Sequence, residues 1–268
     1  MKVSPACDNC YAEGFAKRVG EKVWGTDEPR RFFGDKHWNE PLKWNRDALK
    51  DFGRPARVFC ASMADVFEDR ADLHNHRLRL FDLIQQTPNL LWNLLTKRGT
   101  EIKRYLPMLD EMPNVRIGVT VENQTYDHRI VEGVSWISAE PLLAPLTFRW
   151  AAWDNHQPHR RRVKKLPNVY RDGKFLAGSV DHLDGLRMLD WIIVGGESGA
   201  YAREMKLEWA LKLIDECKEA GVAVHFKQTG DVLARKLRLK DKSGKDPSEW
   251  PEELRIQEFP RVEAVPRG

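Results

Sequence analysis

The feature that most constrains the fold is a unit that recurs along the chain, a short apolar run closed by polar residues and followed by a stretch with helical spacing. Strands that alternate with helices pair in parallel, and right-handed crossovers then curl the sheet. We therefore expect an α/β fold, a complete or partial (β/α) barrel of about six parallel strands. The predicted strands are residues 57–62, 90–96, 115–121, 134–139, 189–194 and 222–226.

Helices are predicted between these strands, at residues 74–87, 100–110, 124–132 and 206–219. The last of them has the clearest pattern, because Trp209, Leu213 and Cys217 recur at four-residue spacing and Gly221 follows as a stop signal. This stripe predicts an amphipathic helix that buries Cys217 in the core.

The length of 268 residues suits one large α/β domain. We expect residues 1–230 to form a barrel-like domain, with an insertion at about 151–188 where the periodicity stops, and residues 231–268 to form a charged C-terminal extension. The insertion holds a basic run whose members are candidates for phosphate contact, although such runs are usually solvated surface. These residues are Arg160, Arg161, Arg162, Lys164 and Lys165.

Composition narrows the class of protein. No apolar run approaches the roughly 18 residues of a membrane helix, and the N-terminus lacks the apolar stretch of a secretory signal. Four scattered cysteines fit a reducing compartment, so we expect a soluble cytoplasmic protein without a membrane partner. With 44 basic and 40 acidic residues, the net charge of +4 permits an anionic partner without requiring one.

Polar residues follow every predicted strand. In a parallel barrel the carboxyl ends of the strands open on one face, so these residues are expected to line a single cleft. Loop solvation alone also places polar residues at strand ends, but their occurrence after each of the six strands favours a site. In chain order they are Ser62, Asp65 and Glu68; Thr96, Lys97 and Arg98; Thr120, Glu122 and Asn123; Glu140; Gly195, Gly196, Glu197 and Ser198; and Lys227 and Gln228.

Cys7 and Cys10 form a C-x-x-C pair directly before a helical stretch. Such a pair is half of a zinc site, a redox pair, or part of an iron–sulfur binding loop. Zinc needs a second pair, yet Cys60 and Cys217 are isolated, and residues 1–6 do not supply the strand that precedes a thioredoxin-type pair. The iron–sulfur interpretation is therefore favoured, and it requires a third cysteine. Cys60 lies within a predicted strand and is expected to be an ordinary buried thiol.

Six segments together carry a family resemblance. They are KVSPACDNCYAE at 2–13, SMADVF at 62–67, LTKR at 95–98, ISAEPLL at 137–143, WIIVGGESG at 191–199 and FKQ at 226–228. In this order, over about residues 2 to 230, the chain resembles the phage-associated gp thirty-seven/gp sixty-eight family. That family is similar to radical S-adenosylmethionine proteins and carries a three-cysteine motif near its N-terminus.

The resemblance implies a 4Fe-4S cluster and S-adenosylmethionine as cofactors, and a nucleic acid or nucleotide substrate in a phage context. It makes Cys7 and Cys10 metal ligands and identifies no catalytic residue. A tight turn after the strand explains Gly195 and Gly196 as well as contact with the cofactor does. The implied cofactor-binding residues are Tyr11, Ser62, Asp65, Glu122, Glu140, Gly195, Gly196 and Glu197, and the implied substrate-binding residues are Lys97, Arg98, Asn123, Lys227 and Gln228.

In the family motif, six residues separate the first cysteine from the second. Cys7 and Cys10 match the second and third, which puts the first immediately before Met1. We therefore expect Met1 to be an internal methionine of a longer reading frame that supplies the first strand and one ligand. A stop codon, or no cysteine, in the upstream in-frame DNA would contradict this.

Two other classes of protein stay open. One is a non-catalytic zinc- or nucleic-acid-binding phage protein. Such a protein would be colourless and would retain zinc, whereas an iron–sulfur protein is brown and air-sensitive. The other is a barrel enzyme of acid–base type that uses Glu122, Glu140 and Glu197. Its activity would survive replacement of Cys7 and Cys10 by alanine.

Overall fold

The computed structural model describes residues 2–148, 169–171, 174–176 and 184–261. The basic run at 159–165 and most of the expected insertion lie outside these residues. The chain divides into two compact units, here called unit 1 (residues 1–118 with 261–268) and unit 2 (residues 119–260).

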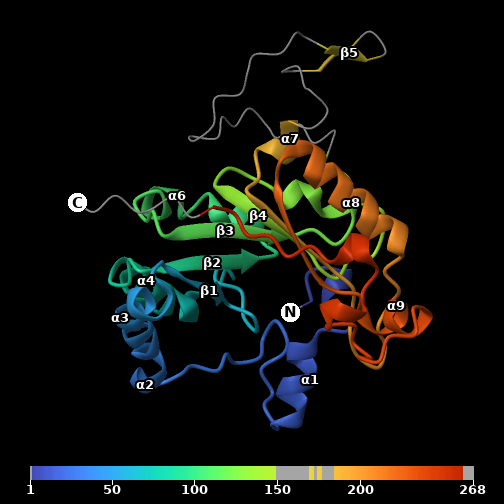
Figure 1. The fold of residues 1–268 in the computed structure, drawn as a ribbon. Helices are drawn as coiled ribbons and strands as arrows, with labels where there is room; N and C mark the ends of the chain where they lie inside the picture. Colours follow the sequence, from blue (N-terminus) through green and yellow to red (C-terminus); the bar gives the residue numbers. More distant parts are fainter. Residues whose placement is uncertain (1, 149–168, 172–173, 177–183, 262–268) are drawn as a thin grey trace. The chain divides into compact units, whose positions relative to one another are not determined.

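Six strands form one sheet in the order β1-β2-β3-β4-β7-β8 (Figure 1). The spatial order follows the chain order, which is the winding of a barrel, whereas a doubly wound sheet reverses direction at a switch point. The predicted class, an α/β fold with six parallel strands in a partial barrel, is confirmed. The strands are β1 Ala56–Cys60, β2 Leu90–Thr96, β3 Val115–Thr120, β4 Val134–Ala139, β7 Trp191–Gly195 and β8 Ala223–Gln228.

In unit 1, α3 and α4 lie beside β1 and β2 (Figure 1). Phe81 of α4 and Leu94 of β2 are at most 1% exposed and belong to the core. The helix predicted over 100–110 is two short helices, because Pro107 has no N–H and its ring excludes the carbonyl of Lys103 from a continuous helix. The helical segments are η1 Pro5–Cys7, α1 Tyr11–Arg18, α2 Asp35–Trp38, α3 Glu40–Phe52, η2 Ala71–Leu73, α4 His74–Gln85, α5 Gly99–Ile102 and α6 Leu106–Leu109.

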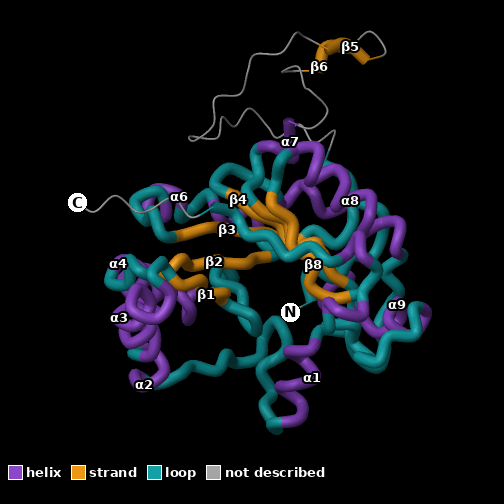
Figure 2. Tube along the Cα trace, in the orientation of Figure 1, coloured by secondary structure: helices purple, strands orange, loops and turns teal. Residues whose placement is uncertain are grey.

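In unit 2, α8 packs on β7 and β8, and its course can be followed in Figure 2. Leu213 and Cys217 of α8 are fully buried, and Gly221 ends the helix with a φ of 71°, so the predicted stripe and stop signal are confirmed. The segment predicted as a helix over 124–132 is the 3₁₀ helix η3. The elements besides β4, β7 and β8 are η3 Gln124–Arg129, the antiparallel pair β5 Val169–Arg171 and β6 Lys174–Leu176, α7 Asp184–Arg187, α8 Leu207–Ala220, α9 Gly230–Lys236, η4 Pro247–Glu249 and η5 Glu252–Leu254.

The segment after residue 230, expected as a charged extension, packs along β8 in its described part. The amide of Phe226 donates to the carbonyl of Ile256 at 2.8 Å, and the amide of Glu258 donates to that of Val224 at 2.9 Å. Trp250 is 1% exposed and meets the Phe226 ring edge-on. This segment therefore completes the core of unit 2. None of the described helices is both long enough and apolar enough to cross a membrane.

Candidate functional site

The C-x-x-C pair occupies the turn that leads into α1. Cys7 ends η1 and is buried, and Cys10 is the half-buried N-cap residue of α1. The amide of Cys7 donates to the carbonyl of Ser4 at 2.9 Å, which closes the short 3₁₀ turn. Both thiols are free, so one ordered loop presents two potential sulfur ligands.

A hydrogen bond joins this loop to the carboxyl end of β1. The Tyr11 hydroxyl donates to the carbonyl oxygen of Ser62 at 2.6 Å. Ser62 lies two residues beyond the end of β1, and Tyr11 is the first residue of α1. The cysteine loop therefore lies next to the strand end where the sequence predicts polar site residues.

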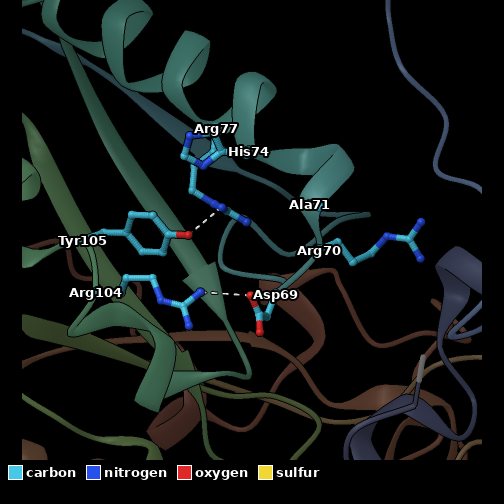
Figure 3. A pocket seen from close by; sticks show the side chains of 7 residues that line it. All are labelled: Asp69, Arg70, Ala71, His74, Arg77, Arg104 and Tyr105. Carbon is cyan, nitrogen blue, oxygen red and sulfur yellow. Dashed lines mark hydrogen bonds and ion pairs between the residues drawn. The ribbon is translucent and has the colours of Figure 1, made fainter.

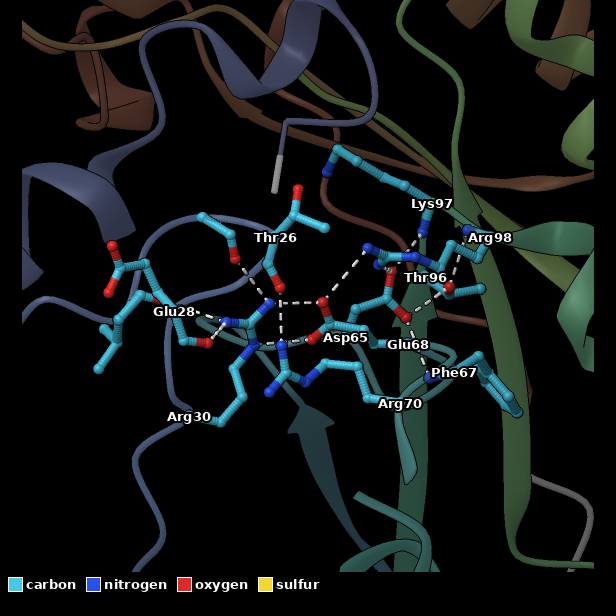
Figure 4. Close-up of polar contacts among 12 residues, drawn as sticks. Thr26, Glu28, Arg30, Asp65, Phe67, Glu68, Arg70, Thr96, Lys97 and Arg98 are labelled. Atoms are coloured by element: carbon cyan, nitrogen blue, oxygen red, sulfur yellow. Dashed lines mark hydrogen bonds and ion pairs between the residues drawn. The ribbon is translucent and has the colours of Figure 1, made fainter. Parts of the chain in front are cut away.

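Asp65 ties the loop after β1 to the loop after β2 (Figure 4). Its carboxylate accepts from the Thr96 hydroxyl at 2.7 Å and from Arg98 Nη1 at 2.8 Å. It also accepts from the backbone amides of Phe67 at 3.0 Å and Lys97 at 3.2 Å. With four donors on one carboxylate, Asp65 fixes the positions of Lys97 and Arg98 relative to β1.

Glu68 lies in the same network and binds a residue that the sequence analysis did not identify. Arg30 donates to both oxygens of Glu68, from Nη2 at 2.7 Å and from Nε at 3.0 Å, and Arg98 lies 3.6 Å away (Figure 4). Burial raises the pKa of Glu68, but the hydrogen bond and charge of Arg30, with the charge of Arg98, outweigh it and bring the pKa below its ordinary 4.5. Glu68 is therefore ionised at neutral pH.

In unit 2, Glu140 and Lys227 lie together. Both carboxylate oxygens of Glu140, which directly follows β4, lie 2.9 Å from the Nζ of Lys227 on β8. The Lys227 side chain is 53% exposed and that of Glu140 is 18% exposed. The pair therefore presents its ammonium group toward solvent at the carboxyl end of the strands.

Gly196 allows two backbone segments of unit 2 to meet. A Cβ atom at Gly196 would overlap with the carbonyl oxygen of Thr229, just after β8. The Gly196 amide donates to the carbonyl of Gln228 at 3.0 Å, and the Gln228 side chain donates back to the carbonyl of Gly196 at 2.8 Å and to the Ser198 hydroxyl at 3.0 Å. Close backbone packing thus accounts for a glycine at position 196.

Two further predicted carboxylates are held by arginines. Glu122 is fully buried, and its carboxylate lies 2.9 Å from Nη1 of the buried Arg129. Glu197 accepts from Arg203 Nη2 at 2.6 Å, from its Nε at 2.9 Å and from its backbone amide at 2.8 Å. Asn123 caps η3 by accepting from the amide of Thr125. The side chains of these predicted site residues thus also organise the loops after the strands.

The cysteine pair fits a metal or cluster only in part. Thiolate sulfur suits both zinc and iron–sulfur clusters, and Cys7 and Cys10 supply two such ligands. Within the described ranges, no three His, Cys, Asp or Glu side chains are grouped so as to hold a metal ion.

The fold and these sites define an α/β partial-barrel protein with a C-x-x-C loop at the carboxyl end of its first described strand. Residues 1–254 match the model of a family described as "Protein of unknown function (DUF5131)", and the chain belongs to that family. No curated protein and no solved structure matches the chain.

Proposed function

We propose that this protein is a radical S-adenosylmethionine-type iron–sulfur enzyme that acts on a nucleic acid or nucleotide in a phage context. One observation carries the proposal: the Tyr11 hydroxyl attaches the C-x-x-C loop to the carboxyl end of β1 in a parallel α/β sheet. The order of the motifs, which resembles that of the gp thirty-seven/gp sixty-eight family, supports it. A cytoplasmic location belongs to the same proposal, because reduced thiols persist there.

Cys7 and Cys10 would hold two irons of a 4Fe-4S cluster. When bound, such a cluster supplies the electron that cleaves the sulfonium of S-adenosylmethionine to a 5′-deoxyadenosyl radical. In unit 1, Tyr11 keeps the cysteine loop against β1, and Asp65 holds the loop that carries Lys97 and Arg98.

The proposed contact with the substrate rests on the positive charge of Lys227. Lys227 is the more exposed member of its pair with Glu140, and it would contact an anionic substrate while Glu140 orients its ammonium group. Gln228 binds the carbonyl of Gly196, so its amide would set the loop beside the substrate. These roles make Lys227 a substrate contact and Gln228 a positioning residue.

The test is anaerobic reconstitution of the purified chain with iron and sulfide, followed by measurement of iron and sulfide per chain. Release of 5′-deoxyadenosine is then measured after addition of S-adenosylmethionine and a reductant. We expect the chain to take up iron through the two thiols of the loop and the double variant Cys7→Ala, Cys10→Ala to lose that iron. The matched control is Cys60→Ala, which removes a thiol from β1 outside the loop and should retain iron.

Two outcomes would contradict the proposal. One is a double variant that binds as much iron as the unaltered chain, which would show that the metal is held elsewhere. The other is a colourless protein that retains zinc and takes up no iron, which would favour the zinc-binding alternative.

A further inference from the structure

A cavity of about 450 Å³ opens in unit 1 beside the start of α4 (Figure 3). This size falls within the roughly 300 to 1,000 Å³ typical of small-ligand pockets. Its lining is cationic and aromatic, and the sequence analysis assigned none of these residues to a site. They are Asp69, Arg70, Ala71, His74, Arg77, Arg104 and Tyr105.

Arg77 is the unusual member of this lining, because it is 5% exposed and all its hydrogen-bond acceptors are neutral. Its Nε donates to the carbonyl of Val66 at 2.7 Å and its Nη2 to the carbonyl of Glu68 at 2.6 Å. Its Nη1 donates to the Tyr105 hydroxyl at 2.6 Å (Figure 3). No carboxylate of the described chain forms an ion pair with it. A guanidinium stays charged in proteins, and buried charges are normally paired. The cavity therefore contains a buried positive charge that lacks a counter-ion.

The rest of the lining adds donors that suit an anion. The Tyr105 hydroxyl accepts from Arg77 and so keeps its own proton for donation to a ligand. Arg104 is 58% exposed, with its Nη1 2.9 Å from Asp69 and its Nη2 3.6 Å from Glu101, so it adds an accessible cation that is already paired with carboxylates. At the start of α4, Leu73 provides no side-chain cap, and the nearest acidic residue, Asp72 of the preceding 3₁₀ turn, is paired with Arg70.

We propose that this cavity binds the phosphate group of a small molecule, either inorganic phosphate or a phosphomonoester. Arginine forks and a tyrosine hydroxyl match the oxygens of a phosphate, and the ligand would supply the negative charge that Arg77 lacks. We choose a small phosphate over a nucleic-acid backbone because Arg77 is nearly inaccessible from the surface. The site is independent of the proposed function, since none of its groups belongs to the cysteine loop.

The test is calorimetric titration with inorganic phosphate and, separately, with ribose 5-phosphate, at an ionic strength held constant with chloride. Arg104→Gln and Tyr105→Phe should each weaken phosphate binding by about tenfold, the loss expected for one hydrogen bond to a charged group. Asp69→Asn should instead tighten binding by about threefold to tenfold, because it removes a carboxylate that repels the ligand and occupies Arg104. Comparison of the two ligands distinguishes free phosphate from a phosphomonoester.

The matched control is Arg79→Gln, which removes an arginine from the same helix outside the cavity and should leave binding unchanged. The opposite signs expected for Asp69→Asn and Arg104→Gln separate ligand binding from general destabilisation. The proposal is overturned if neither phosphate ligand binds beyond the chloride control, or if Arg79→Gln loses as much affinity as Arg104→Gln. It is also overturned if a single-stranded oligonucleotide binds these residues while neither small phosphate does.

Discussion

Glu140 and Lys227 form an ion pair across an intervening strand. Both carboxylate oxygens lie 2.9 Å from the Lys227 Nζ, although β7 separates β4 from β8 in the sheet. The carboxylate crosses β7 at Gly195, where an added Cβ would lie 3.3 Å from the Glu140 carboxyl carbon. Gly195, the last residue of β7, therefore leaves room for the pair, whereas Gly196 leaves room for the backbone of the neighbouring loop.

These two adjacent glycines should respond differently to alanine. Gly196→Ala places a methyl group against the carbonyl of Thr229, whose amide is held by the carbonyl of Gly244 at 3.0 Å, so the backbone has little freedom to yield. We expect the free energy of unfolding to fall by about 3 kcal/mol. Gly195→Ala meets only a side chain and should cost less than about 1 kcal/mol. Urea unfolding followed by tryptophan fluorescence measures both, and equal losses would contradict this account of the glycines.

The pH dependence of stability should reveal the pairing of Glu68 with Arg30. Because the folded-state pKa of Glu68 lies below the ordinary 4.5, its contribution to stability is complete above about pH 4.5 and is lost as the pH falls through the folded value. The difference in unfolding free energy between the unaltered chain and Glu68→Gln should therefore be largest at neutral pH. It should shrink progressively below about pH 4.5.

Denaturant titrations at a series of pH values measure this difference. The matched control is Glu253→Gln, because Glu253 is exposed and forms no ion pair with any described residue. A gap between the unaltered chain and Glu68→Gln that stays constant from neutral pH to well below pH 4.5 would show that Arg30 does not stabilise the carboxylate.

The strands were predictable because their apolar runs are buried and bounded by polar residues. The predicted ranges 90–96 and 134–139 coincide with β2 and β4. By contrast, α3 was not predicted, although Trp44, Ala48 and Phe52 recur at four-residue spacing. Trp44 and Phe52 of that helix are 43% and 62% exposed, and its buried residues are Pro41 and Ala48. Periodicity thus indicates a helix here, but it does not show which of the apolar residues the fold buries.

In two carboxylate–arginine ion pairs, the carboxylate was predictable from its position after an apolar run, but its arginine partner was not. Arg30 lies 38 residues before Glu68, and its position depends on the path of a loop that has no periodic pattern. Arg129 follows Glu122 by seven residues, at the end of a 3₁₀ helix that the pattern predicted as an ordinary helix. Local sequence thus predicts which strand ends are polar but not which cation each carboxylate binds.

The four cysteines should differ in their reaction with iodoacetamide at pH 8. Burial raises the pKa of the Cys60 thiol to about 12, and burial together with the charge of Glu216 raises that of Cys217. The thiolate is the reactive form, and about one Cys60 in ten thousand is ionised at pH 8. We expect the half-buried Cys10 to be modified at least about tenfold faster than Cys60 or Cys217.

Mass spectrometry of tryptic peptides over time gives the four rates. In urea all four thiols should react at similar rates, which controls for the reactivity of each peptide. Raising the pH toward 12 should accelerate modification of Cys60 in the folded chain. Modification of Cys60 at the rate of Cys10 at pH 8 would contradict the raised pKa of the Cys60 thiol.

Trp250 provides a direct test of whether the segment after residue 230 belongs to the core. Its indole is 1% exposed, contacts Phe226 edge-on at a centroid distance of 4.9 Å and donates from Nε1 to the carbonyl of Gly244 at 2.9 Å. Trp250→Ala should lower the free energy of unfolding by about 3 to 5 kcal/mol, through the cavity it leaves and the lost hydrogen bond. Trp44→Ala removes an indole that is 43% exposed and should cost less than about 1 kcal/mol. Urea unfolding followed by far-ultraviolet circular dichroism measures both variants, and a small loss for Trp250→Ala would show that this segment is dispensable for the fold.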